Sequence, residues 1–337
     1  MKAPTVEDVA RVAGVSRQTV SNVINTPAIV REATRERVER AISDLGYRPH
    51  AAARSLRTRR SSTIGIHLDP YAGGISGVVL DRFVHALTER ADDRGMRILL
   101  YAARSAQDEI SRMSELLDGG EIDAVVLSGT FQGDPRTEWL SHRDVPFVAF
   151  GRPWAGDDET AQHRWVDVDG AAGTRQAAQH ARDRAGRLVG FLGWPSGSGT
   201  GDDRERGWIE SLGAARGPRL VAEDRVTAAR AAAADALERH PHLSALVCAS
   251  DTLAIGAHLA AIDAGHTGLV VYGFDNTPAA EAMELSSVEQ RPEQVAAGAL
   301  RLLMGESGSA VGDLPPETQR HIIIEPALVV RGAAAAP

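Results

Sequence analysis

Residues 14 to 25, GVSRQTVSNVIN, carry side chains whose chemistry matches the edges of DNA bases. The apolar residues of this segment share one face at helical spacing, which leaves Arg17, Gln18 and Asn22 on the polar face. Arginine forms paired hydrogen bonds with guanine in the major groove, and glutamine or asparagine does so with adenine. We therefore interpret these three residues as base-reading. The alternative is the solvated face of an ordinary three-helix bundle.

A second set of polar residues in the same region can contact DNA phosphates. It consists of Thr5, Ser16, Thr19, Ser21, Asn25 and Arg31. Hydroxyl, amide and guanidinium groups donate hydrogen bonds to phosphate oxygens, and such contacts fix a protein on the duplex without specifying sequence.

Three short helices must position these residues. Thr5 and Asp8 have the spacing of a capping box, and Gly14 can end the first helix in a left-handed conformation. A second helix, over residues 17–24, follows Ser16, and a third is expected over 32–45. Two short helices joined by a glycine-containing turn, with a third that supports them, predict a helix-turn-helix.

The charge of the chain changes sign along its length. The 337 residues carry a net charge of −8, yet residues 1–60 hold 12 Lys and Arg against 6 Asp and Glu, and the rest holds 25 against 39. A basic head on an acidic body indicates that only the head meets a polyanion.

Residues 50–62, HAAARSLRTRRSS, favour a helix that is too short to be stable alone in water. We expect this segment to be disordered without DNA. A plain basic linker is the alternative, although the single large apolar residue, Leu56, needs a surface that buries it.

The segments TVEDVARVAGVSRQTVSNVIN, VREATRERVERAISDLGYRP and AAARSL together resemble the DNA-binding head of the LacI/GalR family of bacterial transcription regulators. The resemblance implies a hinge helix that forms only on the operator, with Ala53 and Leu56 in the minor groove and Leu56 wedged into a base step. Two positions depart from the family. Asn22 stands where many members carry Arg, and His50 stands where Asn is common.

From residue 62 onward, apolar runs typical of strands alternate with helical patterns. The runs are STIGIHL, RILLYAA, IDAVVLSG, PFVAFGR, WVDVD, RLVGFLG, SALVCAS, GLVVYGF and HIIIEPALVV. Helices are expected near 76–94, 107–118, 170–185, 203–215, 227–240, 251–264 and 292–304. This alternation predicts an α/β core of two lobes, each a parallel sheet covered by helices, with ligands at the carboxyl ends of strands. The family resemblance implies the same bilobed core, of the kind seen in periplasmic binding proteins.

Several predicted strand ends carry polar or aromatic residues that could bind a ligand. The resemblance places Arg204 and Asp275 at effector-binding positions, where a guanidinium and a carboxylate can hold vicinal hydroxyls. An ion pair across the cleft is the alternative for these two. Ser250 stands where sugar-binding members often have Asn, and Gln290 falls on a further pocket position.

Three tryptophans could stack on a pyranose ring, namely Trp165, Trp194 and Trp208. Packing in the core is the alternative for each of them, and it is favoured for Trp208, which falls inside a helical pattern. The glycine-rich stretch 197–201 fits neither a dinucleotide nor a P-loop pattern, so we interpret it as a flexible loop.

The sequence argues against several other classes of protein. The single cysteine, Cys248, lies in an apolar run and fits a buried hydrophobe in a reducing compartment. The 11 histidines show no HExxH spacing and no G-x-S-x-G elbow is found, so we expect no metal site, no cofactor and no enzyme. No export signal and no apolar stretch of membrane-spanning length is found, so we expect a cytoplasmic protein without a membrane partner.

Together with the family resemblance, these patterns predict a homodimeric repressor of carbohydrate genes that a mono- or oligosaccharide releases allosterically from a palindromic operator. We expect a head over 1–49, a hinge over 50–61 and a core over 62–337. The lobes are expected near 62–164 with 291–316, and 165–290 with 317–332. No leucine heptad follows the last strand, which favours a dimer over a tetramer. The same scaffold with a non-sugar effector or corepressor is one alternative, and a solute-binding protein or a dehydrogenase is another.

Overall fold

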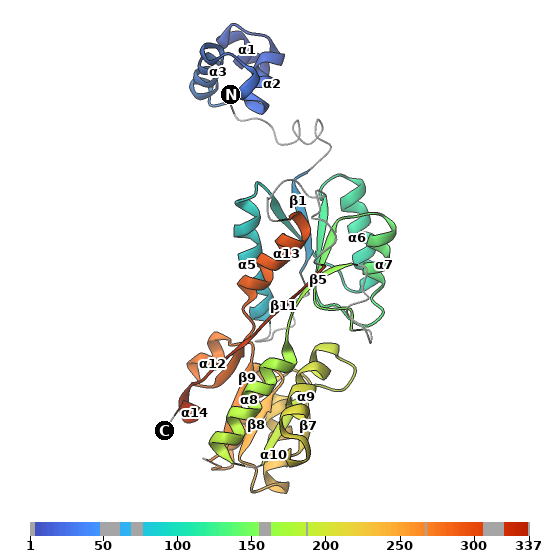
Figure 1. Cartoon of the computed structure of the whole chain (residues 1–337), viewed down its shortest axis with the longest axis vertical. Helices are drawn as coiled ribbons and strands as arrows, with labels where there is room; N and C mark the ends of the chain where they lie inside the picture. Colours follow the sequence, from blue (N-terminus) through green and yellow to red (C-terminus); the bar gives the residue numbers. More distant parts are fainter. Residues whose placement is uncertain are drawn as a thin grey trace. The chain divides into compact units, whose positions relative to one another are not determined.

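The computed structural model describes residues 4–47, 61–68, 77–154, 163–186, 188–266, 268–305 and 320–335. The chain divides into two units, residues 1–61 and 62–337 (Figure 1). The candidate hinge residues Ala53 and Leu56 lie outside the described residues. No helix among the described residues is long and apolar enough to cross a membrane.

The first unit is a small helical domain. Its elements are α1 (Val6–Ala13), α2 (Arg17–Asn25), the short 3-10 helix η1 (Pro27–Ile29) and α3 (Glu32–Leu45). The capping box at Thr5 is present, and Gly14 ends α1 with a φ of 62°. Val9, Val20 and Val38, one from each α-helix, are fully buried against one another. The three expected helices are confirmed.

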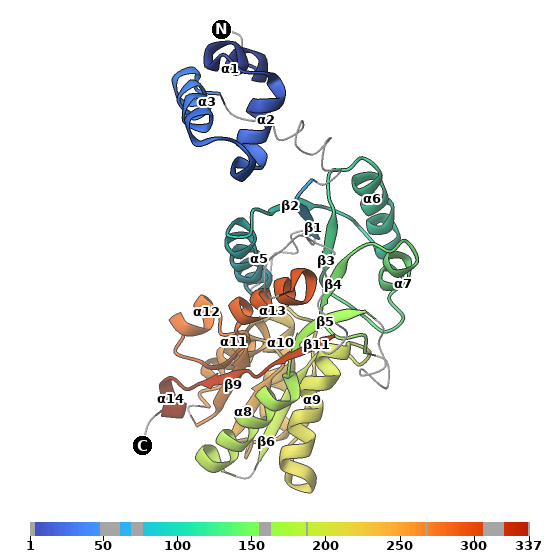
Figure 2. The ribbon, with the colours of Figure 1, turned by 45° about the horizontal axis from the view of Figure 1, so that its top comes forward.

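The second unit contains two six-stranded sheets, and the first has the order β11-β5-β4-β3-β1-β2. Its strands are β1 (Thr63–His67), β2 (Arg97–Tyr101), β3 (Ala124–Leu127), β4 (Phe147–Phe150), β5 (Arg164–Val168) and β11 (His321–Ile324), all paired in parallel. One face packs against α5 (Gly77–Asp92) and α13 (Pro292–Met304), and the other against α6 (Ala106–Asp118) and α7 (Pro135–His142) (Figure 2). We call this sheet and its helices the first lobe.

The second sheet has the order β12-β10-β9-β8-β6-β7. Its strands are β6 (Val189–Gly193), β7 (Arg219–Val221), β8 (Ala245–Cys248), β9 (Val270–Phe274), β10 (Ser286–Glu289) and β12 (Ala327–Val329). Helix α8 (Gly170–Ala185) packs beside α9 (Gly199–Leu212), and α10 (Val226–Arg239) packs beside α11 (Asp251–Asp263) (Figure 2). Short helices η3 (Gly213–Ala215), α12 (Pro278–Ala282) and α14 (Gly332–Ala335) complete this second lobe.

The passages between the lobes differ from the predicted ones. The chain leaves the first sheet after Val168, where we expected a boundary near 165, and after Ile324, where we expected one near 317. The run HIIIEPALVV is two strands in different sheets, and β12 pairs antiparallel to β10. Between β11 and β12 the chain passes from the first lobe to the second with only residues 325–326 in between. The apolar pattern of the sequence continues across this passage and therefore does not reveal it. Only Pro326, which lacks an amide donor, marks the break.

Several short elements were missing from the prediction, among them the helices η1, η3 and α14. Strands β7 and β10 were not expected, because the first has three residues and the second, SSVE, is mostly polar. Helices α7 and α12 have eight and five residues, too few to show a clear helical period. Short elements of this kind depend on the surrounding fold for their stability.

Candidate functional sites

The polar face of α2 presents the three predicted base-reading residues. Arg17 is the first residue of α2, and its exposed guanidinium Nη1 lies 3.0 Å from Oε1 of Glu7 in α1. Gln18 donates from Nε2 to Oδ1 of Asn22 at 2.9 Å. Exposed pairs of this kind contribute only about 0 to 1 kcal/mol, so all three side chains can exchange their partners for base edges at little cost.

Two of the candidate phosphate-binding residues cap helices. The hydroxyl of Thr5 accepts a hydrogen bond from the amide of Asp8 at 3.3 Å, and Ser16 Oγ accepts one from the amide of Thr19 at 3.1 Å. Hydrogen bonds from Thr5 also lower the pKa of Asp8. These hydroxyls therefore build the helix ends that would face a phosphate.

The other candidate phosphate-binding residues are spread over the head. Thr19 and Ser21 are half-buried on α2, and Arg31 is exposed at the N-cap of α3. The side chain of Asn25 lies outside the described part of the structure.

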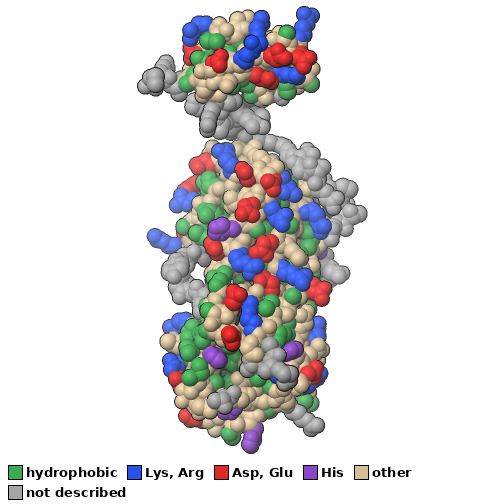
Figure 3. Space-filling view, turned by 90° about the vertical axis from the view of Figure 1, so that its left-hand side faces the viewer, with side chains coloured by type: hydrophobic (Ala, Val, Ile, Leu, Met, Phe, Trp, Pro, Cys, Tyr) green, Lys and Arg blue, Asp and Glu red, His purple; other side chains and the backbone are tan. Residues whose placement is uncertain are grey.

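The positive charge of the head lies mainly outside its folded helices. Residues 4–47 hold six Arg and six Asp or Glu, so the excess of the first 60 residues comes from Lys2 and from the five Arg of residues 48–60. On the face in Figure 3, basic and acidic side chains are interspersed on the described residues of both units. The described residues of the head thus carry no excess of positive charge beside the candidate base-reading groups.

Arg204 and Asp275 meet at the carboxyl ends of the strands in the second lobe. Arg204 lies on α9 and Asp275 directly follows β9, and Nη1 of Arg204 is 3.5 Å from Oδ1 of Asp275. Their relative exposures are 5% and 4%. The Arg204 guanidinium lies 3.7 Å from the ring centroid of Phe274 and donates to the carbonyl of Ala249. Its Nε has no hydrogen-bond partner among the described residues, which leaves a buried donor open for a ligand.

The backbone and Gln290 hold Asp275 in an unusual conformation. Asp275 has a φ of 111°, in the region that favours glycine, and its amide donates to the carbonyl of Val288 at 2.8 Å. Gln290, just beyond β10, donates to Oδ1 of Asp275 at 2.6 Å. Burial raises the pKa of Asp275 to about 8, although Arg204 opposes the shift. The structure thus brings Arg204, Asp275 and Gln290 together.

Ser250 and Trp194 join the same region through a residue that the sequence analysis did not identify. Asp224 Oδ1 accepts hydrogen bonds from Trp194 Nε1 at 3.2 Å and from Ser250 Oγ at 2.5 Å. The Trp194 ring lies 5.5 Å from the Arg204 guanidinium. Ser250 also caps α11, so its hydroxyl is already committed within the protein. Asp224 therefore fixes the indole of Trp194 beside Arg204.

The other two tryptophans pack inside the protein. Trp165 is 3% exposed on β5, faces the core under α6 and α7, and stacks on His321 at 4.6 Å. The structure does not bring it to Arg204, because alternation along β5 points it into the first lobe. Trp208 stacks on Phe191 at 5.6 Å and donates to the carbonyl of Val189, so the packing interpretation is confirmed.

The first lobe contributes charged residues that the sequence analysis also missed. Arg152, just after β4, donates from Nε to Oδ2 of Asp167 at 2.8 Å, and its Nη1 lies 3.8 Å from Oδ1 of Asp203 on α9. Burial raises the pKa of Asp167. Arg152 and Asp167 could have been identified from the sequence by their position at the ends of predicted strands, where ligands bind in α/β sheets.

Six charged side chains therefore gather around the meeting of the lobes. This cleft cluster consists of Arg152, Asp167, Asp203, Arg204, Asp224 and Asp275. Sugar hydroxyls can donate to the carboxylates and accept from the guanidinium groups. No group of His, Cys, Asp and Glu among the described residues could hold a metal ion.

The glycine-rich stretch 197–201 starts a helix. Ser198 is the N-cap of α9, its Oγ accepts from the amide of Gly201 at 3.2 Å, and the helix begins at Gly199. The prediction of a flexible loop is therefore wrong for residues 199–201, since a serine cap compensates for the low helix propensity of glycine. Cys248 is buried, as expected, and burial raises its pKa.

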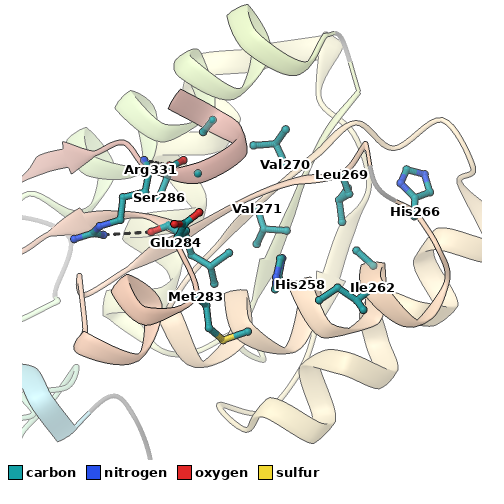
Figure 4. A pocket seen from close by; sticks show the side chains of 14 residues that line it. His258, Ile262, His266, Leu269, Val270, Val271, Met283, Glu284, Ser286 and Arg331 are labelled. Carbon is teal, nitrogen blue, oxygen red and sulfur yellow. Dashed lines mark hydrogen bonds between the residues drawn. The ribbon is translucent and has the colours of Figure 1, made fainter. Parts of the chain in front are cut away.

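A cavity of about 320 Å³ lies in the second lobe at the amino-terminal end of β9, away from the strand ends where Arg204 and Asp275 meet (Figure 4). It is lined by the last turns of α11, the start of β9 and the segment around Arg331, which donates to the carbonyl of Leu285 at 3.2 Å. Figure 4 shows Ile262, Met283 and His258 along one side. None of the predicted effector residues lines this cavity.

Comparison with known proteins links both units to one family. The family model "Bacterial regulatory proteins, lacI family" matches residues 5–50, and "Periplasmic binding proteins and sugar binding domain of LacI family" matches residues 79–291. The HTH-type transcriptional regulator CelR of Thermobifida fusca is 34% identical, over 90% of this chain and 92% of that protein.

Two solved structures are similar over nearly the whole chain. A transcriptional regulator CelR–cellobiose complex is 29% identical with a TM-score of 0.68, over 97% of this chain and 99% of that one. The lac repressor dimer bound to operator and an anti-inducer has a TM-score of 0.81 at 22% identity, over 99% and 100% of the two chains, and so shows the shared fold.

Proposed function

Because the chain belongs to the LacI family of bacterial transcription regulators, we propose that it is a repressor that a small neutral sugar releases from its operator. The observation that carries the effector half of this proposal is the buried Arg204. Its Nε lacks a partner among the described residues, and Asp275 faces it at 3.5 Å. A hydroxylated ligand would supply the missing acceptor.

The DNA-binding half rests on the head. In the proposed assembly a homodimer places two copies of α2 in successive major grooves of a palindromic operator, and Arg17, Gln18 and Asn22 contact base edges. Residues 1–49 form the head, 50–61 the hinge and 62–337 the core in this proposal. The lac repressor dimer on its operator, which shares the fold, supports this arrangement.

Cellobiose is the first effector to test. A CelR structure similar to this chain holds that sugar, and the cleft cluster offers carboxylate acceptors and guanidinium donors beside the indole of Trp194. A ligand held between the lobes changes their relative orientation only by its differential affinity for the two arrangements. We propose no catalytic role. Because the proposed target is chromosomal DNA, we expect the protein to act in the cytoplasm.

Selection from random DNA followed by fluorescence anisotropy tests both halves. The selection should return a palindrome, and neutral disaccharides, monosaccharides and purines are then titrated against the protein–operator complex. Release by a neutral sugar supports the proposal. Enhancement of DNA binding by a purine would make the protein a corepressor-dependent regulator, and absence of any selected motif would contradict the DNA-binding half. Light scattering should give a dimer, and a tetrameric mass would contradict the assembly.

A further inference from the structure

Residues 151–154, which follow β4 in the first lobe and are called this loop below, contact α9 in the second lobe at two places. Trp154 lies directly against the α-carbon of Gly199, since a methyl group added to that carbon would lie 2.3 Å from Cδ2 of the indole. Arg152 Nη1 approaches Oδ1 of Asp203 at 3.8 Å. Gly199 and Asp203 are four residues apart, so they lie on one face of α9, one turn from each other.

The first lobe holds this loop firmly. Arg152 binds Asp167 through Nε at 2.8 Å and the carbonyl of Val168 through Nη2 at 3.1 Å. The hydroxyl of Thr130 donates to the carbonyl of Arg152 at 2.9 Å, and the Arg152 guanidinium lies 5.1 Å from the ring centroid of Trp154. The indole therefore lies between a guanidinium of its own lobe and the backbone of the other lobe.

The backbone at Trp154 supports a constrained role. Its φ is 57°, a left-handed conformation that bulky side chains rarely adopt. Such a conformation persists where the surrounding contacts determine it, and here those contacts belong to both lobes. The absence of a side chain at Gly199 is what allows the indole to approach the helix so closely.

Helix α9 also carries Arg204, the residue after Asp203. A ligand that shifts the backbone at Arg204 shifts α9 with it, and Trp154 and Arg152 contact the first two turns of that helix. We propose that Trp154 is a positioning residue that latches the first lobe onto α9, and so transmits a change at Arg204 to the orientation of the first lobe. The regulatory meaning of this latch rests on the proposed function, whereas its existence does not.

The test measures the distance between the lobes in the ligand-free, full-length protein. Spin labels at Gln107→Cys on α6 and Glu238→Cys on α10 report it by double electron–electron resonance, because both positions are exposed and the native Cys248 is buried. In this labelled protein, Trp154→Ala removes the indole that contacts α9. Gly199→Ala adds a methyl group where the indole now lies, and so prevents the contact. Both should shift or broaden the distance distribution by several ångströms, and Trp154→Phe should restore much of the original distribution.

Trp139→Ala is the matched control. Trp139 on α7 also stacks with an arginine, Arg143, at 5.1 Å, but within the first lobe. The distance distribution should stay unchanged in this control. A wild-type distance distribution in folded Trp154→Ala or Gly199→Ala would overturn the latch. An equal change in Trp139→Ala would show that the effect is not specific to the contact between the lobes. These distance measurements use neither operator nor effector, so failure of the latch and failure of the proposed function can be distinguished.

Discussion

Arg204 Nη1 lies 3.5 Å from Asp275 Oδ1 within one lobe, since α9 and the residue that follows β9 both belong to the second lobe. The pair therefore does not tie the two lobes together, which removes the alternative of an ion pair across the cleft. Inter-lobe contact at this site comes instead from Arg152 and Trp154 on the first lobe. In the proposed function the pair therefore binds the ligand, whereas Arg152 and Trp154 make the contacts between the lobes.

Arg204→Ala should abolish the response to effector and leave the operator affinity of the ligand-free protein nearly unchanged. Coupling between sites in allosteric proteins is typically worth about 1 to 3 kcal/mol, and the variant should lose that whole shift. The measurement is operator affinity by anisotropy with and without the sugar found in the panel. Arg175→Ala, an exposed arginine on α8, is the control. A normal ligand response in Arg204→Ala would defeat the site, and weaker operator binding without ligand would make the pair structural.

The pH dependence of stability should report Asp275. Its pKa is raised from the ordinary 3.8 to about 8 in the folded protein, so folding takes up a proton between these values. The free energy of unfolding therefore falls as pH rises from about 4 to 8, by at most about 1.4 kcal/mol per pH unit from this group. Asp275→Asn should remove that contribution. Urea unfolding at several pH values checks it, and parallel curves for both proteins would show that the carboxyl stays ionised.

Base reading should be lost one position at a time. Arg17→Ala or Gln18→Ala should cost roughly 1 to 3 kcal/mol per half-site and relax the preference at one operator position. Glu7→Gln removes the exposed partner of Arg17 without removing a base contact, so it should leave the selected motif intact. If Arg17→Ala selects the same motif as the wild type from random DNA, the base-reading role is wrong.

Non-specific affinity should depend on the basic segment that precedes the core. Residues 4–47 are balanced in charge, so substituting Arg57, Arg59 and Arg60 by Ala should lower the slope of log affinity against log salt by about 1 per arginine. Arg37→Ala on α3, where Glu36 precedes the arginine in the charge-balanced head, serves as the control. An unchanged slope in the triple variant would show that these arginines do not contact phosphate.

The residues that the sequence predicted well are those whose roles depend on local patterns. Thr5 and Ser16 were recognisable as caps, and the structure confirms both. The family resemblance named Arg204 and Asp275, which the structure brings within 3.5 Å, while their role in binding an effector stays a prediction. Asp224, Arg152 and Trp154 were not identified, because their roles arise from contacts between segments far apart in the chain. Trp165 had the residue type of a ligand platform, but only the alternation along β5 decides which way it points.

The charge of the cleft cluster should select against anionic effectors. Even with Asp275 protonated at neutral pH, three carboxyl groups face two guanidinium groups there, so a phosphate or carboxylate on the ligand would meet more repulsion than attraction, strengthened by burial. A neutral sugar pairs its hydroxyls with both kinds of group and adds no charge. Calorimetry with glucose, glucose 6-phosphate and glucuronic acid, and with cellobiose beside cellobionic acid, compares ligands of one shape and different charge. The neutral member of each set should bind at least tenfold more tightly. Tighter binding of the anionic member would show that Arg152 and Arg204 outweigh the carboxyl groups, and would redirect the search toward phosphorylated or acidic sugars.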